Sequence, residues 1–333
     1  MRAGELVTLG RTDLRVSRLG LGLASIGGLF APVPEEQALA TVNRAWDLGI
    51  RLFDTAPVYG YGRSERRAGT ALRKRPRDRF VLCTKVGRLI EPGGPDTQPI
   101  WADPPAGVGP RLDRSYAATL RSLEDSLERL GADRVDVLHI HDPEQDYPTA
   151  LAQTYRALAE LRDDGVIGAV SLGVNHADVA ARFIRDAPPP GPDCVLLAGR
   201  LTLLDQSGLD DLVPLCQQRG IAMMAAGVYQ GGALTASRAD APGAPGWVPA
   251  AMAARIQAIR DTCQHHDVPV LAAAVQYPFR HAPVSSVVVG ARAPDEIAET
   301  AALLGHPVPP ACWAALERRG LIRATVAPGK PGG

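Results

Sequence analysis

The chain has 333 residues, and 46% of them are hydrophobic, which is enough for a large buried core. Its 36 basic and 36 acidic residues balance, so the composition gives no support for a nucleic-acid partner or an anionic membrane surface. The sequence has neither a signal-peptide pattern nor an apolar stretch long enough to span a membrane, and we expect a cytoplasmic protein. Its five cysteines are widely separated, a pattern typical of reduced thiols rather than of a zinc site or a disulfide framework.

The predicted elements repeat the order of short apolar strand, turn and amphipathic helix. Residues 5–16 predict a β-hairpin that turns at Gly10. Barrel strands are expected at 19–23, 50–54, 80–85, 135–141, 169–174, 194–197, 221–226 and 286–290. Helices are expected between them, including one from about 34, others at 64–73, 114–130 and 149–164, and one opened by Pro294. This order predicts a (β/α)8 TIM barrel, an α/β fold, with a single domain over 1–333 and a flexible tail at about 325–333.

The segment from Val86 to Asp113 interrupts this pattern. It is rich in proline and glycine and shows no periodicity, so we expect an irregular loop after the third strand. A loop of this length is usually a lid or a substrate loop, and less often a disordered insert. Trp101 lies within it, and because polar sugars often lie against an aromatic face, we expect Trp101 to contact the substrate.

A doubly wound dinucleotide-binding fold is the competing architecture. Gly20-Leu21-Gly22 supplies the first two glycines of its fingerprint, but Ser25 stands at the third position. Asp54 is too distant to be the acid that follows the second strand. The fingerprint is therefore incomplete, and we reject this fold.

Four reactive side chains follow consecutive predicted strands. Asp54 ends the second strand, Tyr59 lies in the next turn, and Lys85 and His141 end the third and fourth strands. Each residue alone has an ordinary structural explanation, such as a capping acid or a satisfied core histidine. Because the carboxyl ends of barrel strands share one face, where active sites form, we expect these four side chains to meet there.

The chemistry that these groups suit is proton transfer to an oxygen, without a metal. A phenol has a pKa of about 10 and is a poor acid or base at neutral pH. The Lys85 ammonium favours the Tyr59 phenolate, and Asp54 keeps that ammonium charged and aimed. His141 can then orient a carbonyl or hydroxyl oxygen. His139, two residues earlier, shares the same face of its strand one layer deeper, and we interpret it as structural.

At these residues the sequence resembles the aldo-keto reductases. The segments 53–60, 84–86 and 140–143 are similar, in order, to the catalytic tetrad motifs of that family, and the resemblance covers nearly the whole chain. It implies that Tyr59 is the acid/base, that Lys85 and Asp54 tune it, and that His141 orients the substrate. The segments 85–89, 121–124, 173–175 and 197–205 resemble most the branch that oxidises aldoses at the anomeric carbon, or related pyridoxal-type substrates.

The resemblance also implies a nicotinamide cofactor, which we expect to be NADP with NAD possible. Asn175 remains from the pair that holds the nicotinamide amide, and Ala198 stands where the family usually has a glutamine. Glu299 and Thr300 take the positions near the adenine. Tyr229, after the seventh strand, is expected to stack on the cofactor or close over it.

The end of the eighth strand predicts the phosphate site. Backbone N–H groups at the start of the helix opened by Pro294 attract phosphate, and Gly290 lets the backbone come close. Arg292 has the fork geometry for a 2′-phosphate and, by the resemblance, the position to contact it. Asp295 and Glu296 add negative charge beside the cofactor. We therefore expect both cofactors to bind, with NADP the tighter.

Together these features predict an NAD(P)-dependent oxidoreductase that converts a cyclic aldose to its lactone. One alternative is reduction of a small aldehyde or ketone at the same site. A second alternative, from another class, is a non-catalytic NADP-binding subunit, which the intact set of reactive residues disfavours. The expected partner is a small carbonyl or sugar substrate, and the sequence leaves open whether the protein is a monomer or a homo-oligomer.

Overall fold

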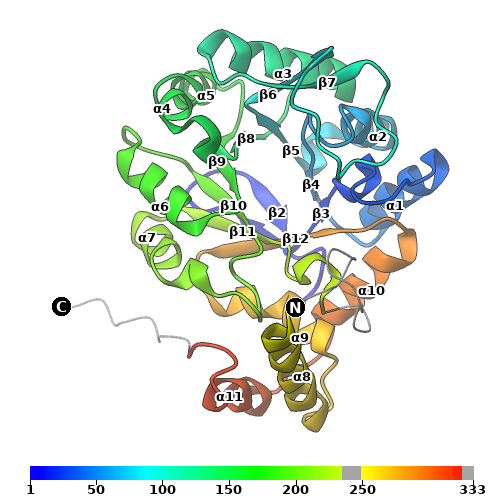
Figure 1. Cartoon of the computed structure of the whole chain (residues 1–333), viewed down its shortest axis with the longest axis vertical. Coiled ribbons are helices and arrows are strands. Elements are labelled where there is room, and N and C mark those ends of the chain that lie inside the picture. Colours follow the sequence, from blue (N-terminus) through cyan, green and yellow to red (C-terminus); the bar gives the residue numbers. More distant parts are fainter. Residues whose placement is uncertain (235–248, 325–333) are drawn as a thin grey trace.

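The structure, a computed structural model, describes residues 1–234 and 249–324 (Figure 1). Eight parallel strands close a barrel in the order β10-β11-β12-β3-β4-β5-β8-β9, which confirms the predicted (β/α)8 fold. The strands are β3 (Leu19–Gly22), β4 (Leu52–Asp54), β5 (Val81–Val86), β8 (Val137–His141), β9 (Ala169–Val174), β10 (Cys194–Ala198), β11 (Ala222–Ala226) and β12 (Val284–Gly290). The tail predicted at 325–333 lies outside the described residues.

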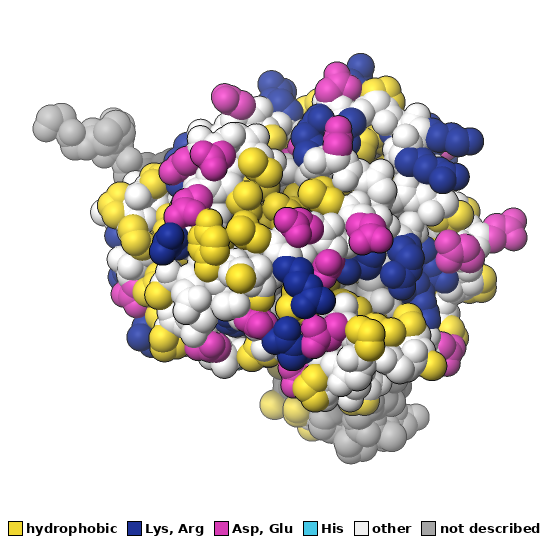
Figure 2. Space-filling view, turned by 90° about the horizontal axis from the view of Figure 1, so that it is seen from above, with side chains coloured by type: hydrophobic (Ala, Val, Ile, Leu, Met, Phe, Trp, Pro, Cys, Tyr) yellow, Lys and Arg dark blue, Asp and Glu magenta, His cyan; other side chains and the backbone are white. Residues whose placement is uncertain are grey.

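Helices surround the barrel in Figure 1. They are α1 (Glu35–Asp47), α2 (Arg63–Leu72), α3 (Tyr116–Leu130), α4 (Tyr147–Thr149), α5 (Tyr155–Asp163), α6 (Ala177–Asp186), α7 (Leu212–Arg219), α8 (Ala250–His265), α9 (Val270–Gln276), α10 (Pro294–Gly305) and α11 (Pro310–Arg318). Within the described ranges, none of them combines the length and hydropathy needed to cross a bilayer. In Figure 2, which views the molecule from above, acidic and basic side chains are interspersed with hydrophobic ones.

Local sequence signals set the bounds of α3. Ser115 caps its first turn by accepting a hydrogen bond of 3.2 Å from the backbone N–H of Ala118. Gly131 ends the helix in a left-handed conformation with φ of 58°. The helix predicted over 149–164 is confirmed, and its first part is a five-residue π-helix, Ala150–Thr154, that joins α4 to α5. The hydroxyl of Thr154 there donates to the carbonyl oxygen of Arg114 at 2.7 Å.

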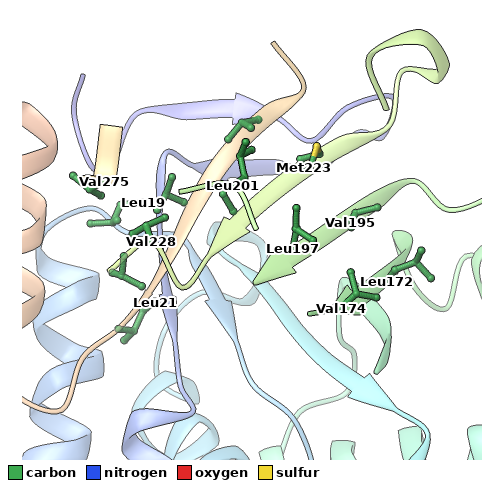
Figure 3. Packing of buried hydrophobic residues seen from close by; sticks show 14 of the residues in the cluster. Leu19, Leu21, Leu172, Val174, Val195, Leu197, Leu201, Met223, Val228 and Val275 are labelled. Atoms are coloured by element: carbon green, nitrogen blue, oxygen red, sulfur yellow. The ribbon is translucent and has the colours of Figure 1, made fainter. Parts of the chain in front are cut away.

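Two apolar layers hold the barrel. The outer layer packs the strands against the helices, and Figure 3 shows members of it from several strands, including Leu21, Leu172, Val195 and Met223, together with Val275 of α9. The inner layer fills the barrel and comprises Leu52, Val81, Cys83, Val137, Ala169, Cys194, Leu196, Ala222, Met224 and Val288. Residues of a strand alternate between these two layers, so the next inward positions after Leu52 and Cys83 are Asp54 and Lys85.

The predicted amino-terminal hairpin is confirmed. It consists of β1 (Leu6–Thr8) and β2 (Arg15–Ser17), which pair antiparallel. Leu9 and Val16, one in the hairpin turn and one in β2, are fully buried and belong to the inner layer of the barrel. The hairpin therefore covers the amino-terminal end of the barrel, opposite the strand ends that carry the reactive residues.

The prediction that residues 86–113 form an irregular loop is wrong in part. The segment contains two antiparallel strands, β6 (Arg88–Pro92) and β7 (Val108–Leu112), paired over five positions. The pairs include Ile90 with Pro110 and Glu91 with Gly109. Proline and glycine are depleted in strands, so these residues conceal the strands from a reading based on propensity.

Candidate active site

The structure brings the four predicted reactive side chains together. Asp54 and His141 are the last residues of β4 and β8, and Lys85 is the last but one of β5. These three strands are consecutive neighbours in the barrel, and Tyr59 lies in the turn after β4. The Nζ of Lys85 lies 5.1 Å from the centroid of the Tyr59 ring. The His141 ring lies 6.1 Å from the same ring, nearly perpendicular to it. The arrangement places a phenol, an ammonium and an imidazole at one mouth of the barrel.

The turn that presents Tyr59 has a fixed course. The hydroxyls of Thr55 and Ser64 are 2.8 Å apart, which ties the end of β4 to the first turn of α2. Gly60 has a positive φ of 60°, and a Cβ there would lie 2.0 Å from the carbonyl oxygen of Gly27. Only glycine fits this close approach of two backbones, so the residue after Tyr59 cannot carry a side chain without moving the turn.

A buried ion pair lies beneath Tyr59. The ammonium of Lys85 donates to both carboxylate oxygens of Asp54 at 2.7 Å and to the carbonyl oxygen of Thr55 at 2.9 Å. Burial alone raises the pKa of Asp54, but Lys85 and His139 outweigh it and lower this pKa to about 2. Burial lowers the pKa of Lys85, whereas Asp54 and Tyr59 raise it, and the net effect is an increase. Both groups therefore remain charged at neutral pH.

His139 is part of this network, so its interpretation as merely structural is incomplete. Its side chain is fully buried, its Nε2 lies 3.1 Å from Oδ1 of Asp54, and its Nδ1 lies 2.8 Å from the hydroxyl of Ser171. Spacing alone placed His139 one layer below His141. The contact with Asp54 depends on the strand register that sets His139 beside Lys85, and this register is absent from a single sequence.

Tyr59 titrates differently from the sequence-based expectation. Burial of the phenol raises its pKa, and Lys85 lowers it, as predicted. Burial has the larger effect, so the pKa of Tyr59 rises to about 12 instead of falling. In the protein without its ligands, the phenol is therefore protonated at neutral pH, and an additional positive charge nearby would be needed to favour the phenolate.

His141 is a neutral ring. Burial, followed by the positive charges of Arg88 and Lys85, lowers its pKa well below the usual range. Arg114 fixes the backbone at this point, because one of its Nη atoms donates to the carbonyl oxygens of His141 and Asp142, each at 2.6 Å. A neutral imidazole in a fixed position can share a hydrogen bond with a substrate oxygen.

The segment 86–113 reaches the same mouth. The Trp101 ring lies 5.4 Å from the Tyr59 ring and is 6% exposed. Its indole N–H donates to the side chain of Gln98 at 2.8 Å, and its backbone forms a bridge with Leu29. The segment is thus attached to the connection between β3 and α1, with the face of an aromatic ring beside the phenol. Its contact with substrate stays a prediction.

Asn175 follows β9 on this side of the site. It is exposed, and its amide donates to Oδ1 of Asp142 at 3.0 Å. Ala198, the last residue of β10, is half-buried and offers no polar side chain. Of these two positions, only residue 175 therefore carries a carboxamide, and it follows β9, the neighbour of the strand that carries His141.

Tyr229 and Thr300 also come together. The Tyr229 hydroxyl lies 3.4 Å from Oγ1 of Thr300 on α10, and Tyr229 is half-buried. Glu299 is exposed on the same helix. These contacts connect the loop after β11 to α10, while the cofactor roles of the three residues stay predictions.

The end of β12 has unmet hydrogen-bonding capacity. The backbone N–H of Arg292 donates to Glu296 at 2.8 Å, and its guanidinium donates to the carbonyl oxygen of Leu29 at 3.0 Å. The Nε of Arg292 is buried and has no hydrogen-bond partner among the described residues. A Cβ at Gly290 would lie 2.6 Å from Oγ of Ser25. A bare backbone, a hydroxyl and a guanidinium with spare donors fit the phosphates of a dinucleotide.

Ser25 is a residue that the sequence reading did not assign to this site. It follows β3, and β3 pairs with β12 so that Gly22 lies opposite Gly290. Closure of the barrel thus joins the first strand to the last and brings Ser25 to the end of β12.

A cavity of about 270 Å³ between α2 and α3 contains none of the predicted site residues.

Comparison with known proteins follows this geometry. The model of the Aldo/keto reductase family matches residues 18–319. The chain is 40% identical to the pyridoxal 4-dehydrogenase of Microbacterium luteolum, covering 97% of this chain and 99% of the relative. It is 37% identical to a D-threo-aldose 1-dehydrogenase of a Pseudomonas species, covering 93% and 95%. Among solved structures, the holo form of an aldo-keto reductase from Bacillus halodurans superposes with a TM-score of 0.77 at 25% identity, covering 98% of both chains.

Proposed function

We propose, from the premise that the chain belongs to the aldo/keto reductase family, that it oxidises the C1 hydroxyl of a cyclic aldose to a lactone. As a member of this family it is an NAD(P)-dependent oxidoreductase. The observation that carries the finer proposal is the phenol of Tyr59 beside the buried Lys85–Asp54 pair and the neutral His141.

The residues divide the chemistry as follows. NAD(P)+, when bound, supplies the acceptor for the hydride that leaves the substrate carbon. Tyr59 as phenolate takes the hydroxyl proton, so the substrate loses one hydride and one proton. Lys85 opposes the effect of burial on the phenol, and Asp54 keeps Lys85 charged. The neutral ring of His141 holds the reacting oxygen.

The substrate class is argued from the mouth of the barrel and from the relatives. The Trp101 ring lies beside Tyr59, and its proposed role is to contact the sugar ring. Two relatives with high coverage are named dehydrogenases of pyridoxal and of D-threo-aldoses. Both names describe small, ring-forming carbonyl compounds, which supports a substrate of this kind here.

For the cofactor, we propose that both nicotinamide dinucleotides bind and that NADP binds more tightly. The residues proposed to hold it are Asn175, Tyr229, Gly290, Arg292, Glu296, Glu299 and Thr300. The spare donors of Arg292 suit a 2′-phosphate. The Glu296 carboxylate, 2.8 Å from the Arg292 backbone nitrogen, opposes it and limits the preference for NADP.

One observation favours reduction of an aldehyde or ketone as a second function. With a pKa of about 12, Tyr59 holds its proton at neutral pH and can donate it to a carbonyl oxygen. The same site would then run in the opposite direction, with the reduced cofactor.

A single set of assays tests these proposals. Nicotinamide absorbance is followed with a panel of aldoses, pyridoxal and simple aldehydes for the wild type, Tyr59→Phe and the surface control Tyr116→Phe. We expect an aldose to be oxidised by the wild type and by Tyr116→Phe, and turnover to be lost in Tyr59→Phe with cofactor affinity unchanged. Wild-type kcat in Tyr59→Phe would remove the acid/base role, and activity only with aldehydes would establish the reductive function instead.

A further inference from the structure

His139 occupies the barrel interior, directly below the reactive groups. It is fully buried on β8, and the register pairs it with Lys85 on β5 and with Ser171 on β9. A side chain at this depth cannot meet a substrate at the mouth. Any effect on the reaction has to pass through the groups that it contacts.

The contacts define which ring nitrogen carries the proton. Asp54 is ionised and can only accept, so the His139 Nε2 that lies 3.1 Å from it carries the hydrogen. Nδ1 is then a lone pair that can accept from the Ser171 hydroxyl at 2.8 Å, which is nearer than the carbonyl oxygen of Leu172 at 3.3 Å, the other acceptor of that hydroxyl. Burial lowers the pKa of His139, which keeps the ring neutral. Nε2 makes no full hydrogen bond among the described residues, so the contact acts mainly as a dipole directed at the carboxylate.

Among the described residues, the polar groups that contact or perturb His139 are Asp54 on β4, Cys83 and Lys85 on β5, and Ser171 and the backbone of Leu172 on β9. Ligand atoms of Asp54, Cys83 and His139 lie within 4.8 Å of one another, a spacing that would suit a metal ion. The Lys85 ammonium, 2.7 Å from both Asp54 oxygens, already places a positive charge there, so the cluster is organised by hydrogen bonds and an ion pair.

We propose that His139, anchored by Ser171, is a positioning residue that holds the Asp54 carboxylate and increases the effect of Lys85 on Tyr59. The negative charge of Asp54 raises the pKa of Tyr59, and the charge of Lys85 lowers it. The His139 N–H directed at Asp54 partly offsets the negative charge of the carboxylate, so more of the electrostatic effect of Lys85 reaches the Tyr59 phenol. The inference rests on the proposed acid/base role of Tyr59.

Four variants test it. His139→Leu removes the donor while filling the space, and His139→Gln restores an N–H at a similar distance from the backbone. Ser171→Ala removes only the anchoring hydroxyl. Met224→Leu is the control, because Met224 is a fully buried apolar residue of the same interior. The measurements are the pH profile of kcat for oxidation, the Kd of NADP+, and the melting temperature.

We expect His139→Leu to lower kcat at a pH below the rising limb roughly three-fold or more, the factor that half a unit of pKa gives, without changing the Kd of NADP+. The rising limb of its pH profile should move to higher pH by about half a unit or more. His139→Gln should recover most of both effects, Ser171→Ala should show a smaller shift in the same direction, and Met224→Leu should show none. The proposal would be overturned if the rising limb of His139→Leu stayed at its wild-type pH, or if the limb of Met224→Leu moved by the same amount as that of His139→Leu.

One further measurement tests the state of the His139 ring directly. Nitrogen NMR of the histidine rings, with His139→Gln for assignment, should find a neutral His139 protonated at Nε2, and a proton at Nδ1 or a charged ring would contradict the proposal. If His139→Leu does not fold, Ser171→Ala carries the kinetic test alone. If Tyr59→Phe is active, the proposed function is refuted. If Tyr59→Phe is inactive but the pH profile of His139→Leu has its rising limb at the wild-type pH, only the role of His139 is refuted.

Discussion

The carboxyl end of the barrel has two unlike halves. On β4, β5 and β8 the last inward side chains are Asp54, Lys85 and His141, which are charged or polar. On β10, β11 and β12 the corresponding strands end in Ala198, Ala226 and Gly290, which are small. Both sets of strands are parallel members of one barrel, so the difference between their terminal residues comes from side-chain choice.

This difference separates two requirements of one reaction. Buried polar groups are costly unless they are partnered, so they are stable only where they can contact one another, as the Lys85 ammonium and the Asp54 carboxylate do. Residues without large side chains leave room for a flat ring and expose backbone N–H groups to phosphates. One half is thus suited to moving a proton, and the other to holding a dinucleotide.

The largest expected effect comes from breaking the charged half. Lys85→Met should lower kcat by about 10²–10⁴-fold, because the phenol loses the ammonium that favours its base form. It should also reduce the free energy of unfolding by about 3–5 kcal/mol, because Asp54 is left buried without its partner. Steady-state kinetics and urea unfolding provide the two values.

The double variant Asp54→Asn with Lys85→Met is the matched control. It removes the uncompensated charge, so most of the stability should return while turnover stays lost. Recovery of activity together with stability would mean that Lys85 matters for folding and not for the proton transfer.

In the other half, Arg292→Ala should weaken NADP by about 1.5–3 kcal/mol, the range for hydrogen bonds to charged groups, and leave NAD nearly unchanged. Glu296→Gln is the opposite change, since it removes a carboxylate 2.8 Å from the Arg292 nitrogen, and it should strengthen NADP selectively. Fluorescence titration with both cofactors measures these effects. Equal losses for NAD and NADP in Arg292→Ala would show that this residue does not read the 2′-phosphate.

A smaller effect is expected from the aromatic face above the charged half. Trp101→Ala should raise the KM for the sugar several-fold, corresponding to about 1 kcal/mol of lost ring contact, with little change in the Kd of the cofactor. Trp101→Phe should retain part of the contact. If KM for substrate is the same in all three proteins, the segment 86–113 does not take part in binding.

The smallest effect concerns stability and pH. The pKa values of His139 and His141 are lowered in the folded protein. Below about pH 6.5, the ordinary pKa of a histidine, both rings are therefore protonated in the unfolded chain but not in the folded one. Stability should therefore fall as the pH drops from 7 to 5. Asp54, with its pKa lowered to about 2, adds a further loss as the pH falls from about 4 towards 2. Melting temperatures measured across this range, and a shallower slope in His139→Leu, check the prediction; an unchanged melting temperature between pH 7 and 5 would contradict it.

Much of the fold was predictable, because each barrel strand is a short apolar run between turn signals. The residues at the ends of those strands were predictable as well, since parallel topology alone sends Asp54, Lys85 and His141 to one face. The strands β6 and β7 were not predictable, because Pro110 and Gly109 mask them.

The sequence does not reveal which residues of neighbouring strands lie side by side, or how deeply each side chain is buried. The contact of His139 with Asp54 and the approach of Ser25 to Gly290 both depend on which residues of neighbouring strands lie side by side. The direction of the Tyr59 pKa shift depends on how much solvent reaches the phenol, and burial there outweighs the lysine. Neither quantity is encoded in local spacing.

The amino-terminal hairpin has a consequence for proton traffic. Leu9 and Val16 fill the far end of the barrel with apolar, fully buried side chains. In the proposed oxidation, we expect the proton taken from the substrate to leave through the mouth of the barrel, where Tyr59 and His141 lie half-buried. The Asp54 carboxylate and the Lys85 ammonium below them are buried, and we expect both to stay charged while Tyr59 exchanges its proton.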